Sequence, residues 1–302
     1  MLLFVLLFSL IISSESTFLK VDDNFNDTFQ IHFSLDDFQV NKEGSYTKVI
    51  TSAGYTSVIG MPKLPMYSSM VMLDPEKEYE LEYEVKSSYI VDDVKMIPNQ
   101  RVINGIEKIS IDDIDYDFYN SSNSYPYVNV TLSEPMVMRD IVVSTVTVVP
   151  FQYIPSNNQL EVYETIEINI REVGYNEDIR RRQMPRSKVF ENIYKNEILN
   201  YEQLSRDGEY QTPSILYICG GDSESNSAFQ QLVEWRRQRG YVVYTEKVSD
   251  IGSSASSIKN YIENAYNTFD PPPEYVALVG DIDGDYSIPT YYAEFGHNSY
   301  GN

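Results

Sequence analysis

The 302-residue sequence predicts a mixed fold, an antiparallel β-sandwich followed by an incomplete parallel α/β domain. From Phe18 to about Val173 the pattern is that of short strands, as in residues 79–85, where apolar residues alternate with glutamate. Beyond Pro213, short apolar runs alternate with stretches of helical periodicity, an order typical of parallel sheets. Apolar residues make up 42% of the chain, which is enough for ordinary cores.

The first 16 residues have the features of a secretory signal peptide. Residues 1–12 are almost wholly apolar, and small residues follow, so we expect cleavage after Ser16. The run is too short to span a bilayer as a helix, which takes about 20 apolar residues. Only the free amine charges its start, because no lysine or arginine precedes the apolar run. We therefore expect a secreted or cell-surface protein that leaves the membrane once this peptide is removed.

Charge and cysteine content narrow the possible functions. The chain has 45 acidic and 23 basic residues, a net charge of -22, and would repel a phosphate backbone, so nucleic acid is excluded as a partner. The same carboxylates are available to bind calcium. Cys219 is the single cysteine, so the chain forms no intramolecular disulfide.

The composition changes between residues 174 and 212. Arg180, Arg181 and Arg182 form the one tri-basic run of this acidic chain, and Met184 and Pro185 follow it closely. A polar, basic stretch between two patterned regions is typical of an exposed linker, where proteases cut. A solvated run of charge is the alternative interpretation.

Residues 213–302 follow the order strand, helix, strand, helix, strand. The strands are predicted at 214–219, 241–248 and 274–279, and the helices around 229–240 and 258–269. Three parallel strands and two helices leave both sheet faces incompletely covered and one edge exposed, which parallel sheets rarely tolerate. The region is therefore expected to be a truncated piece of a larger domain.

Few residues could carry chemistry. A nucleophilic cysteine needs a base within hydrogen-bond reach, and the sequence has only His32 and His297. Cys219 ends the first α/β strand, where a free cysteine is usually a small buried hydrophobe. His32 lies among strand residues and His297 in a polar tail, so both are expected to be non-catalytic. The spacing of histidine and cysteine does not match a zinc site.

Carboxylates follow the last predicted strand. Asp281, Asp283 and Asp285 alternate with other residues, and Gly284 lies between the last two. Oxygen ligands in this arrangement suit calcium, and the carboxyl ends of parallel strands are where α/β folds bind ligands. The stretch is not an EF-hand loop, because the later glutamate is missing. An acidic turn without a metal is the alternative.

Several stretches resemble the gingipain family of clan CD cysteine peptidases. Residues 234–240 read Glu-Trp-Arg-Arg-Gln-Arg-Gly, similar to a helix end of the family, and residues 275–281 followed by Ile288-Pro289 resemble its Tyr-Val-Leu-Leu-x-Gly-Asp strand. Upstream, residues 60–65 and 149–155 resemble landmarks of the gingipain propeptide. The resemblance runs, with gaps, from about residue 20 to 302.

The resemblance implies a domain order. It implies a signal peptide (1–16), a propeptide β-sandwich (17–173), a linker (174–212) whose Arg180–Arg182 run is the processing candidate, and the N-terminal part of a caspase-like catalytic domain (213–302). The catalytic Cys/His dyad would lie beyond Asn302, so Cys219 and His297 do not match it. Asp281 matches an aspartate that binds structural calcium in the family, whereas Asp283 and Asp285 have no such match.

The function implied is that of a secreted cysteine endopeptidase precursor, here a fragment without the dyad and inactive on its own. Its expected partners are its own catalytic domain, bound by the propeptide, and protein or peptide substrates, bound through the missing part. Two alternatives stay open: a prodomain-like inhibitory or binding module, and a calcium-dependent surface adhesion protein.

Overall fold

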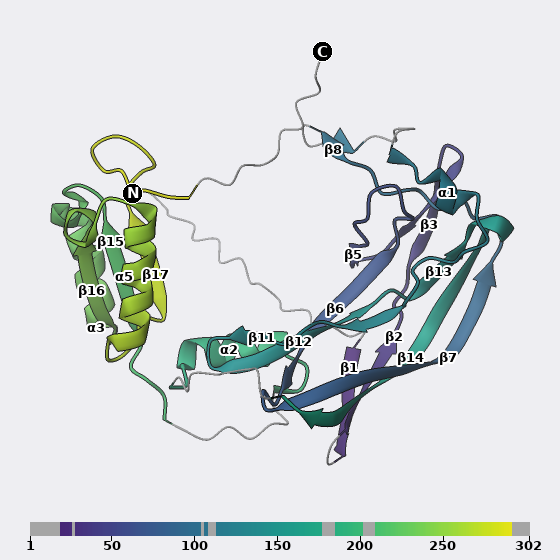
Figure 1. The fold of residues 1–302 in the computed structure, drawn as a ribbon, viewed down its shortest axis with the longest axis horizontal. Coiled ribbons are helices and arrows are strands. Elements are labelled where there is room, and N and C mark those ends of the chain that lie inside the picture. Colours follow the sequence, from purple (N-terminus) through teal and green to yellow (C-terminus); the bar gives the residue numbers. More distant parts are fainter. Residues whose placement is uncertain are drawn as a thin grey trace, which may run out of the picture. The chain divides into compact units, whose positions relative to one another are not determined.

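The computed structural model describes residues 19–25, 28–103, 106–107, 113–176, 185–201 and 209–291. It divides into a β unit (residues 1–184 and 193–206) and an α/β unit (residues 185–192 and 207–302). Figure 1 shows long strands in the first, and strands flanked by helices in the second. None of the helices in the described ranges has the length and apolar character needed to cross a membrane.

The β unit consists of strands joined by short connections. In chain order they are β1 (Leu19–Phe25), β2 (Thr28–Ser34), β3 (Gln39–Glu43), β4 (Tyr46–Ile50), β5 (Gly54–Tyr55), β6 (Pro65–Leu73), β7 (Lys77–Val91), β8 (Val102–Ile103), β9 (Ile106–Glu107), β10 (Val130–Leu132), β11 (Met136–Met138), β12 (Ile141–Val148), β13 (Phe151–Ile154) and β14 (Gln159–Tyr175). Two short helical segments, α1 (Tyr116–Tyr119) and η2 (Pro155–Asn157), interrupt them. The predicted turn at Pro155–Asn158 joins β13 to β14, and Asn158 adopts a left-handed conformation there.

Two five-stranded sheets make up most of this unit. One has the order β1-β2-β14-β13 with β7 also paired to β14, and the other has the order β10-β12-β6-β5 with β11 also paired to β12. All these pairings are antiparallel. Side chains from both sheets share one core, as Phe33 and Ile166 of the first and Tyr67 and Val146 of the second show.

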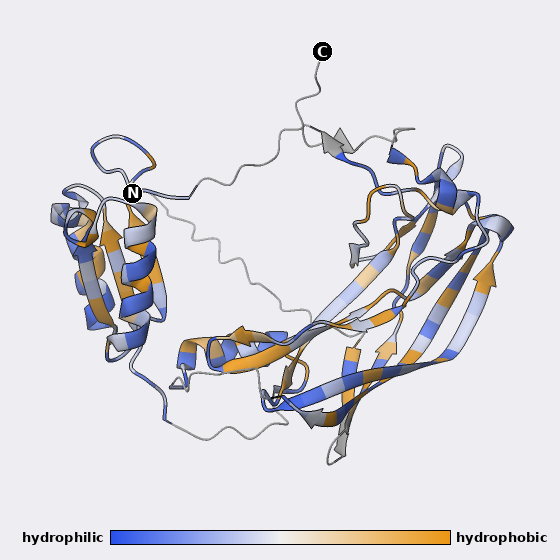
Figure 2. Cartoon of the chain, viewed as in Figure 1, coloured by the Kyte–Doolittle hydropathy of each residue, from blue (hydrophilic) through white to orange (hydrophobic). Residues whose placement is uncertain are grey.

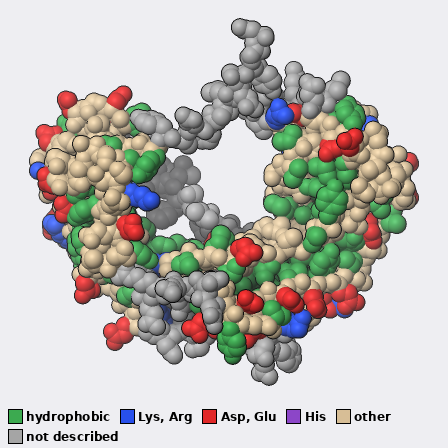
Figure 3. Space-filling model, in the orientation of Figure 1, with side chains coloured by type: hydrophobic (Ala, Val, Ile, Leu, Met, Phe, Trp, Pro, Cys, Tyr) green, Lys and Arg blue, Asp and Glu red, His purple; other side chains and the backbone are tan. Residues whose placement is uncertain are grey.

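Period-2 patterning explains this arrangement. Hydrophilic and hydrophobic residues alternate along the long strands in Figure 2, so each strand has one apolar face for the core. On the opposite face of β7 and β14, Lys86 pairs with Glu167 at 2.8 Å and Arg171 with Glu80 at 3.3 Å. Such exposed pairs add little stability, but Lys86 binds both Glu84 and Glu167, which face each other across the strands, and so offsets their repulsion. In Figure 3, acidic side chains with a few basic ones lie along the lower right border of the molecule, where Figure 1 draws β7.

The α/β unit contains a three-stranded parallel sheet. Its elements are β15 (Ser214–Cys219), η4 (Ser223–Ser225), α3 (Ser227–Gln238), β16 (Val242–Lys247), α4 (Val248–Ile251), α5 (Ala255–Thr268) and β17 (Tyr275–Val279). The order is β16-β15-β17, and every residue of the central strand is buried. On one face α5 packs Ile258 against Leu216, and on the other face α3 packs Phe229 against Tyr217. The predicted succession of strands and helices is confirmed.

One face of this sheet is only partly covered. Val276 and Leu278 of the edge strand β17 are 41% and 51% exposed, whereas the alternate residues of β17 pack on the α3 side. Two helices cover the central strand but do not reach across the edge strand on the α5 side. The incompletely covered sheet face expected from three strands and two helices is therefore present in the described residues.

The interval 174–212 contains ordered structure that the pattern did not predict. Helix α2 (Lys188–Glu197) lies within it, and Tyr194, Ile198 and Tyr201 are buried. Ile198 forms a parallel bridge with Met70 of β6. Aromatic and aliphatic residues three to four positions apart give this stretch one apolar face, which packs on the β unit. The Arg180–Arg182 run lies outside the described residues, as do Ser16 and His297.

Candidate functional site

Cys219 and Asp281, two of the residues singled out from the sequence, lie at the carboxyl end of the parallel sheet. Cys219 is the last residue of β15, and Asp281 follows β17 by two positions. Because β15 and β17 run parallel, with Cys219 in register with Val279, both strands deliver their ends to the same edge.

Cys219 is a buried thiol, and no histidine is bonded to it among the described residues. It packs with Phe229 and Val233 and is fully buried. Burial raises the pKa of the thiol above its ordinary value, and this effect outweighs a hydrogen bond with Ser223 that lowers it. Within the described residues the one histidine, His32, belongs to β2 of the other unit. A protonated thiol of this kind is a poor nucleophile, so the structural role predicted for Cys219 fits its surroundings.

Three glycines allow the loop 281–288 to lie directly on the strand ends. A Cβ atom on Gly220 or Gly280 would overlap the carbonyl oxygen of Tyr286, and one on Gly221 would overlap that of Asp285. Gly221 also has a φ of +55°, which favours glycine. The sequence pattern left Gly220 and Gly221 without a role, and the structure gives them one in close backbone packing.

Backbone hydrogen bonds hold this loop in place. The amide of Gly220 donates to the carbonyl of Val279 over 2.9 Å, and the hydroxyl of Ser223 donates to the same oxygen over 3.0 Å. Asp281 donates its amide to Tyr286 over 3.0 Å and accepts from the amide of Ile288 over 2.8 Å. The loop is therefore a tight turn closed on itself by Asp281.

The carboxylates of this loop point to solvent without converging. Asp281 accepts a hydrogen bond from the amide of Ile282 over 2.7 Å, and Asp281, Asp283 and Asp285 are all exposed. In the described part of the chain no group of three or more His, Cys, Asp or Glu side chains is placed to hold a metal ion. Calcium takes about six to eight oxygen ligands, so the described residues alone do not fit it. Asp281 as a calcium ligand stays a prediction.

Charged residues missed in the sequence lie at the same edge. Glu224 forms an ion pair with Lys247, the last residue of β16, with 3.2 Å between its Oε2 and the ammonium nitrogen. Thr245 also donates to Glu224 over 3.4 Å. The sequence clue to these residues was their position, because Glu224 follows the strand β15 and Lys247 ends the strand β16. The pair joins η4 to β16. Burial is the largest cause that raises the pKa of the Cys219 thiol; the charge of Glu224 also raises it, and that of Lys247 lowers it.

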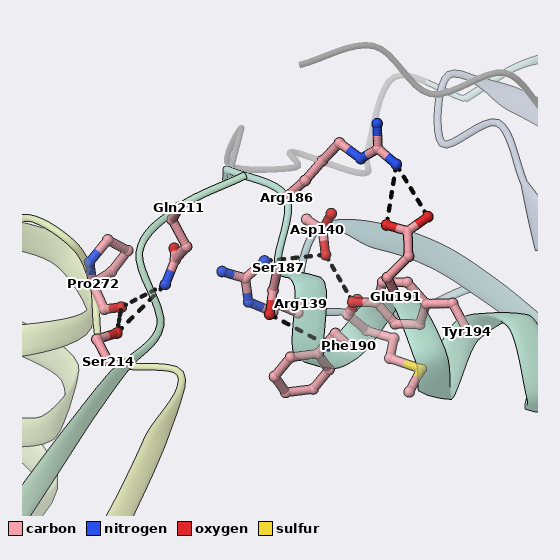
Figure 4. A network of polar contacts seen from close by, with 11 residues as sticks. Arg139, Asp140, Arg186, Ser187, Phe190, Glu191, Tyr194, Gln211, Ser214 and Pro272 are labelled. Atoms are coloured by element: carbon pink, nitrogen blue, oxygen red, sulfur yellow. Dashed lines mark hydrogen bonds and ion pairs between the residues drawn. The ribbon is translucent and has the colours of Figure 1, made fainter. Parts of the chain in front are cut away.

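Residues after the basic run make polar contacts within each unit, and Figure 4 draws several of them. In the α/β unit, Arg186 binds both carboxylate oxygens of Glu191 at 3.0 and 3.1 Å and donates to the Tyr210 hydroxyl over 2.7 Å. In the β unit, Tyr194 donates to the buried carboxylate of Asp140 over 2.7 Å. These contacts fix the chain on the C-terminal side of the basic run.

Asn200 adds a further contact in the β unit. Its side-chain oxygen accepts from the amide of Met72 over 2.7 Å, and its amide group donates to the carbonyl of Met72 over 2.9 Å. Leu199 also donates its amide to Met70 over 3.0 Å. Residues 198–200 therefore extend the sheet beside β6.

Comparisons with known proteins agree with the two-part structure. The family model Propeptide_C25 matches residues 12–207, and the model Peptidase family C25 matches residues 209–301. Gingipain R2 of Porphyromonas gingivalis is 28% identical over 269 residues, which cover 83% of this chain and 36% of that protein. Lys-gingipain of the same species is 31% identical over 155 residues, which cover 48% of this chain and 9% of that protein.

A solved structure supports the fold. A complex of Porphyromonas gingivalis RgpB pro- and mature domains matches with a TM-score of 0.50 and 23% identity, over 62% of this chain and 98% of the matched one. The present chain spans about a third of the length of the Gingipain R2 relative. With the propeptide model matching more than half of it, the chain belongs to the gingipain family of cysteine peptidases, family C25, and includes the propeptide.

Proposed function

We propose that this chain is precursor sequence of a secreted gingipain-type cysteine endopeptidase. It would comprise a signal peptide (1–16), a β-sandwich propeptide (17–173), a cleavable linker (174–212) and the N-terminal part of a caspase-like catalytic domain (213–302). The observation that carries the proposal is the direct succession of the propeptide and peptidase family matches. The described structure changes from antiparallel to parallel sheets over the same interval, which supports it.

The proposed reaction of the intact enzyme is attack of a cysteine thiolate on a peptide carbonyl, with backbone amides stabilising the oxyanion. Among the described residues, Cys219 is the single thiol, and no histidine is bonded to it. We therefore expect residues 1–302 to hydrolyse no peptide on their own. The β unit would instead bind its own catalytic domain and restrain it, as the named RgpB complex suggests by analogy.

Assays of hydrolysis and inhibition test this proposal. The purified chain is incubated with arginine- and lysine-containing peptide substrates, alone and together with an active family C25 peptidase. The expected results are no hydrolysis by the chain and a concentration-dependent loss of the peptidase's rate. Cys219→Ala, the control, should inhibit equally well. Hydrolysis by the chain that disappears on alkylation of Cys219 would overturn the proposal.

Processing is tested by limited proteolysis. A trypsin-like protease is expected to cut first within Arg180–Arg182, and replacement of all three arginines by glutamine should move the first cut elsewhere. A first cut outside this run in the unsubstituted chain would remove it as the processing site.

The N-terminus of chain collected from the medium is expected at Thr17, and a retained N-terminus would rule out cleavage after Ser16.

For calcium, we propose that Asp281 supplies one ligand, together with oxygen atoms from outside the described residues. Calorimetric titration of the chain with calcium chloride tests this, with Asp281→Asn as the variant. Asp283→Asn is the matched control, because that carboxylate is exposed on the same loop. Equal binding by Asp281→Asn and by the unsubstituted chain would remove Asp281 from any site.

A further inference from the structure

A groove of about 610 Å³ opens at the margin of the β unit's core. One wall is the start of β7 and the other is β10 with the residues after it. Among the described strands, β7 pairs only with β14 and β10 only with β12, so each is the edge of its sheet. Apolar side chains line both walls, among them Leu73, Tyr79, Leu81, Val130 and Leu132. The groove is the place where the shared core of the two sheets reaches solvent.

Ser144 lies on this groove with a buried hydroxyl group. It is opposite Val71 of β6 and on the same face of β12 as the core residue Val146. The residue is fully buried, and in the described structure its hydroxyl has no hydrogen-bond partner. Buried polar groups are nearly always paired, so an unpaired hydroxyl that lines a groove indicates a polar atom supplied from outside.

The rim of the groove is negatively charged. Glu78 and Glu134 line it and are exposed, and neither forms an ion pair with another described residue. The lysine of the rim, Lys77, is bound to Glu172 and lies 4.1 Å from the ring centre of Tyr175. The carboxylates at the rim are thus left to attract a cationic ligand.

We propose that this groove binds an extended, basic peptide segment of another protein chain. In an extended segment every second side chain points the same way, about 7 Å apart. Of three such side chains in a row, the two outer ones, if basic, can meet the carboxylates of the rim. The middle one then enters the groove. A polar group on that middle side chain would pair with the Ser144 hydroxyl. The open edge of β7 supplies backbone groups for the segment, as in recognition by strand addition.

Fluorescence anisotropy with a labelled peptide tests the proposal. The probe is Thr-Arg-Thr-Gln-Thr-Arg-Thr, and the control peptide has glutamate in place of both arginines. We expect the full chain to bind the probe and not the control, with an affinity that falls as salt is added. Glu78→Gln combined with Glu134→Gln should weaken binding about tenfold. Glu82→Gln, which removes a charge of the same strand outside the groove, should change it less than about twofold.

A second comparison isolates Ser144. Ser144→Ala should weaken the probe several-fold but leave a peptide with alanine at the middle position unchanged, because the coupling requires both polar groups. Thermal unfolding shows that the variants fold, and Ser144→Ala should not melt lower, since it removes an unpaired hydroxyl. Equal binding of the arginine probe and its glutamate control would overturn the proposal. So would an equal effect of Ser144→Ala on the glutamine-containing probe and on the peptide with alanine at the middle position. Self-association abolished by the Glu78/Glu134 variant would assign the groove to a second copy and also overturn it.

Discussion

Replacement of Asn200 tests whether the segment after α2 is an integral part of the β unit. The side chain of Asn200 is buried and bonded to both backbone groups of Met72, a residue 128 positions earlier in the chain. It therefore acts as a short piece of strand beside β6. Asn200→Ala must therefore weaken β6 as well as the segment itself.

The structure sets the expected magnitude. Two side-chain hydrogen bonds are lost at about 1 kcal/mol each, and the amide and carbonyl of Met72 are left buried without partners, which adds to the cost. We expect Asn200→Ala to lower the free energy of unfolding of the β unit by about 2–4 kcal/mol. Asn200→Asp keeps the acceptor but turns a carboxylate oxygen toward the Met72 carbonyl, so it should be at least as destabilising.

Hydrogen exchange read by mass spectrometry is the assay. The Met72 amide donates directly to Asn200, so peptides covering Pro65–Leu73 should lose protection by a factor of about 30 to 1,000. Asn123→Ala is the matched control, because Asn123 is exposed, and it should change protection by less than a factor of about 3. If Asn200→Ala and Asn123→Ala protect β6 equally, residues 198–200 are not bound as described.

Three further predictions concern the rest of the chain. After cleavage within Arg180–Arg182 the two fragments should elute together on size exclusion and separate in urea, because Tyr194 and Asn200 remain bound in the β unit; separation without urea would contradict this. Burial raises the pKa of Tyr119. The stability that this residue contributes is therefore complete below its unfolded pKa of about 10 and is lost as pH rises toward its folded pKa. Tyr119→Phe should flatten the fall of the unfolding midpoint above about pH 10, and an unchanged slope would refute this. Gly220→Ala should displace the loop 281–288 and speed its proteolysis, whereas Gly54→Ala, whose Cβ would meet only an ordinary contact, should not.

The parallel sheet could be predicted because its signals are local. A largely apolar strand at 214–219, helical spacing in the next stretch, and Gly240 after it are all visible within a few residues. The structure places α3 there, and Gly240 adopts a φ of +85° beyond the helix end. The position of Cys219 as a buried strand end followed from the same local pattern. Local periodicity was sufficient for the strands and helices of this sheet, whereas it did not reveal α2.

The pairings of the β unit could not be predicted in the same way. Residues 198–200 pair with β6, more than 120 positions away, and no local pattern indicates that Asn200 is buried. The groove depends on which strands end each sheet, and sheet order is decided by contacts between distant strands. Asp281 shows the opposite limit. Its position after a strand was correct, but the neighbouring carboxylates do not converge, since alternation along a loop does not fix side-chain directions.

The buried polar side chains of Ser214, Asn129 and Asn200 bind groups of their own unit, and the contrast with them supports an external partner for Ser144. Ser214 donates to the carbonyl of Pro272 over 2.6 Å, Asn129 to that of Val149 over 2.7 Å, and Asn200 holds Met72. Each repays its own desolvation with a bond inside its unit. Ser144 is as deeply buried and has no such bond among the described residues, yet it borders a groove with an acidic rim. Core packing alone would favour alanine or valine there, so a ligand with a polar atom explains the hydroxyl better than stability does.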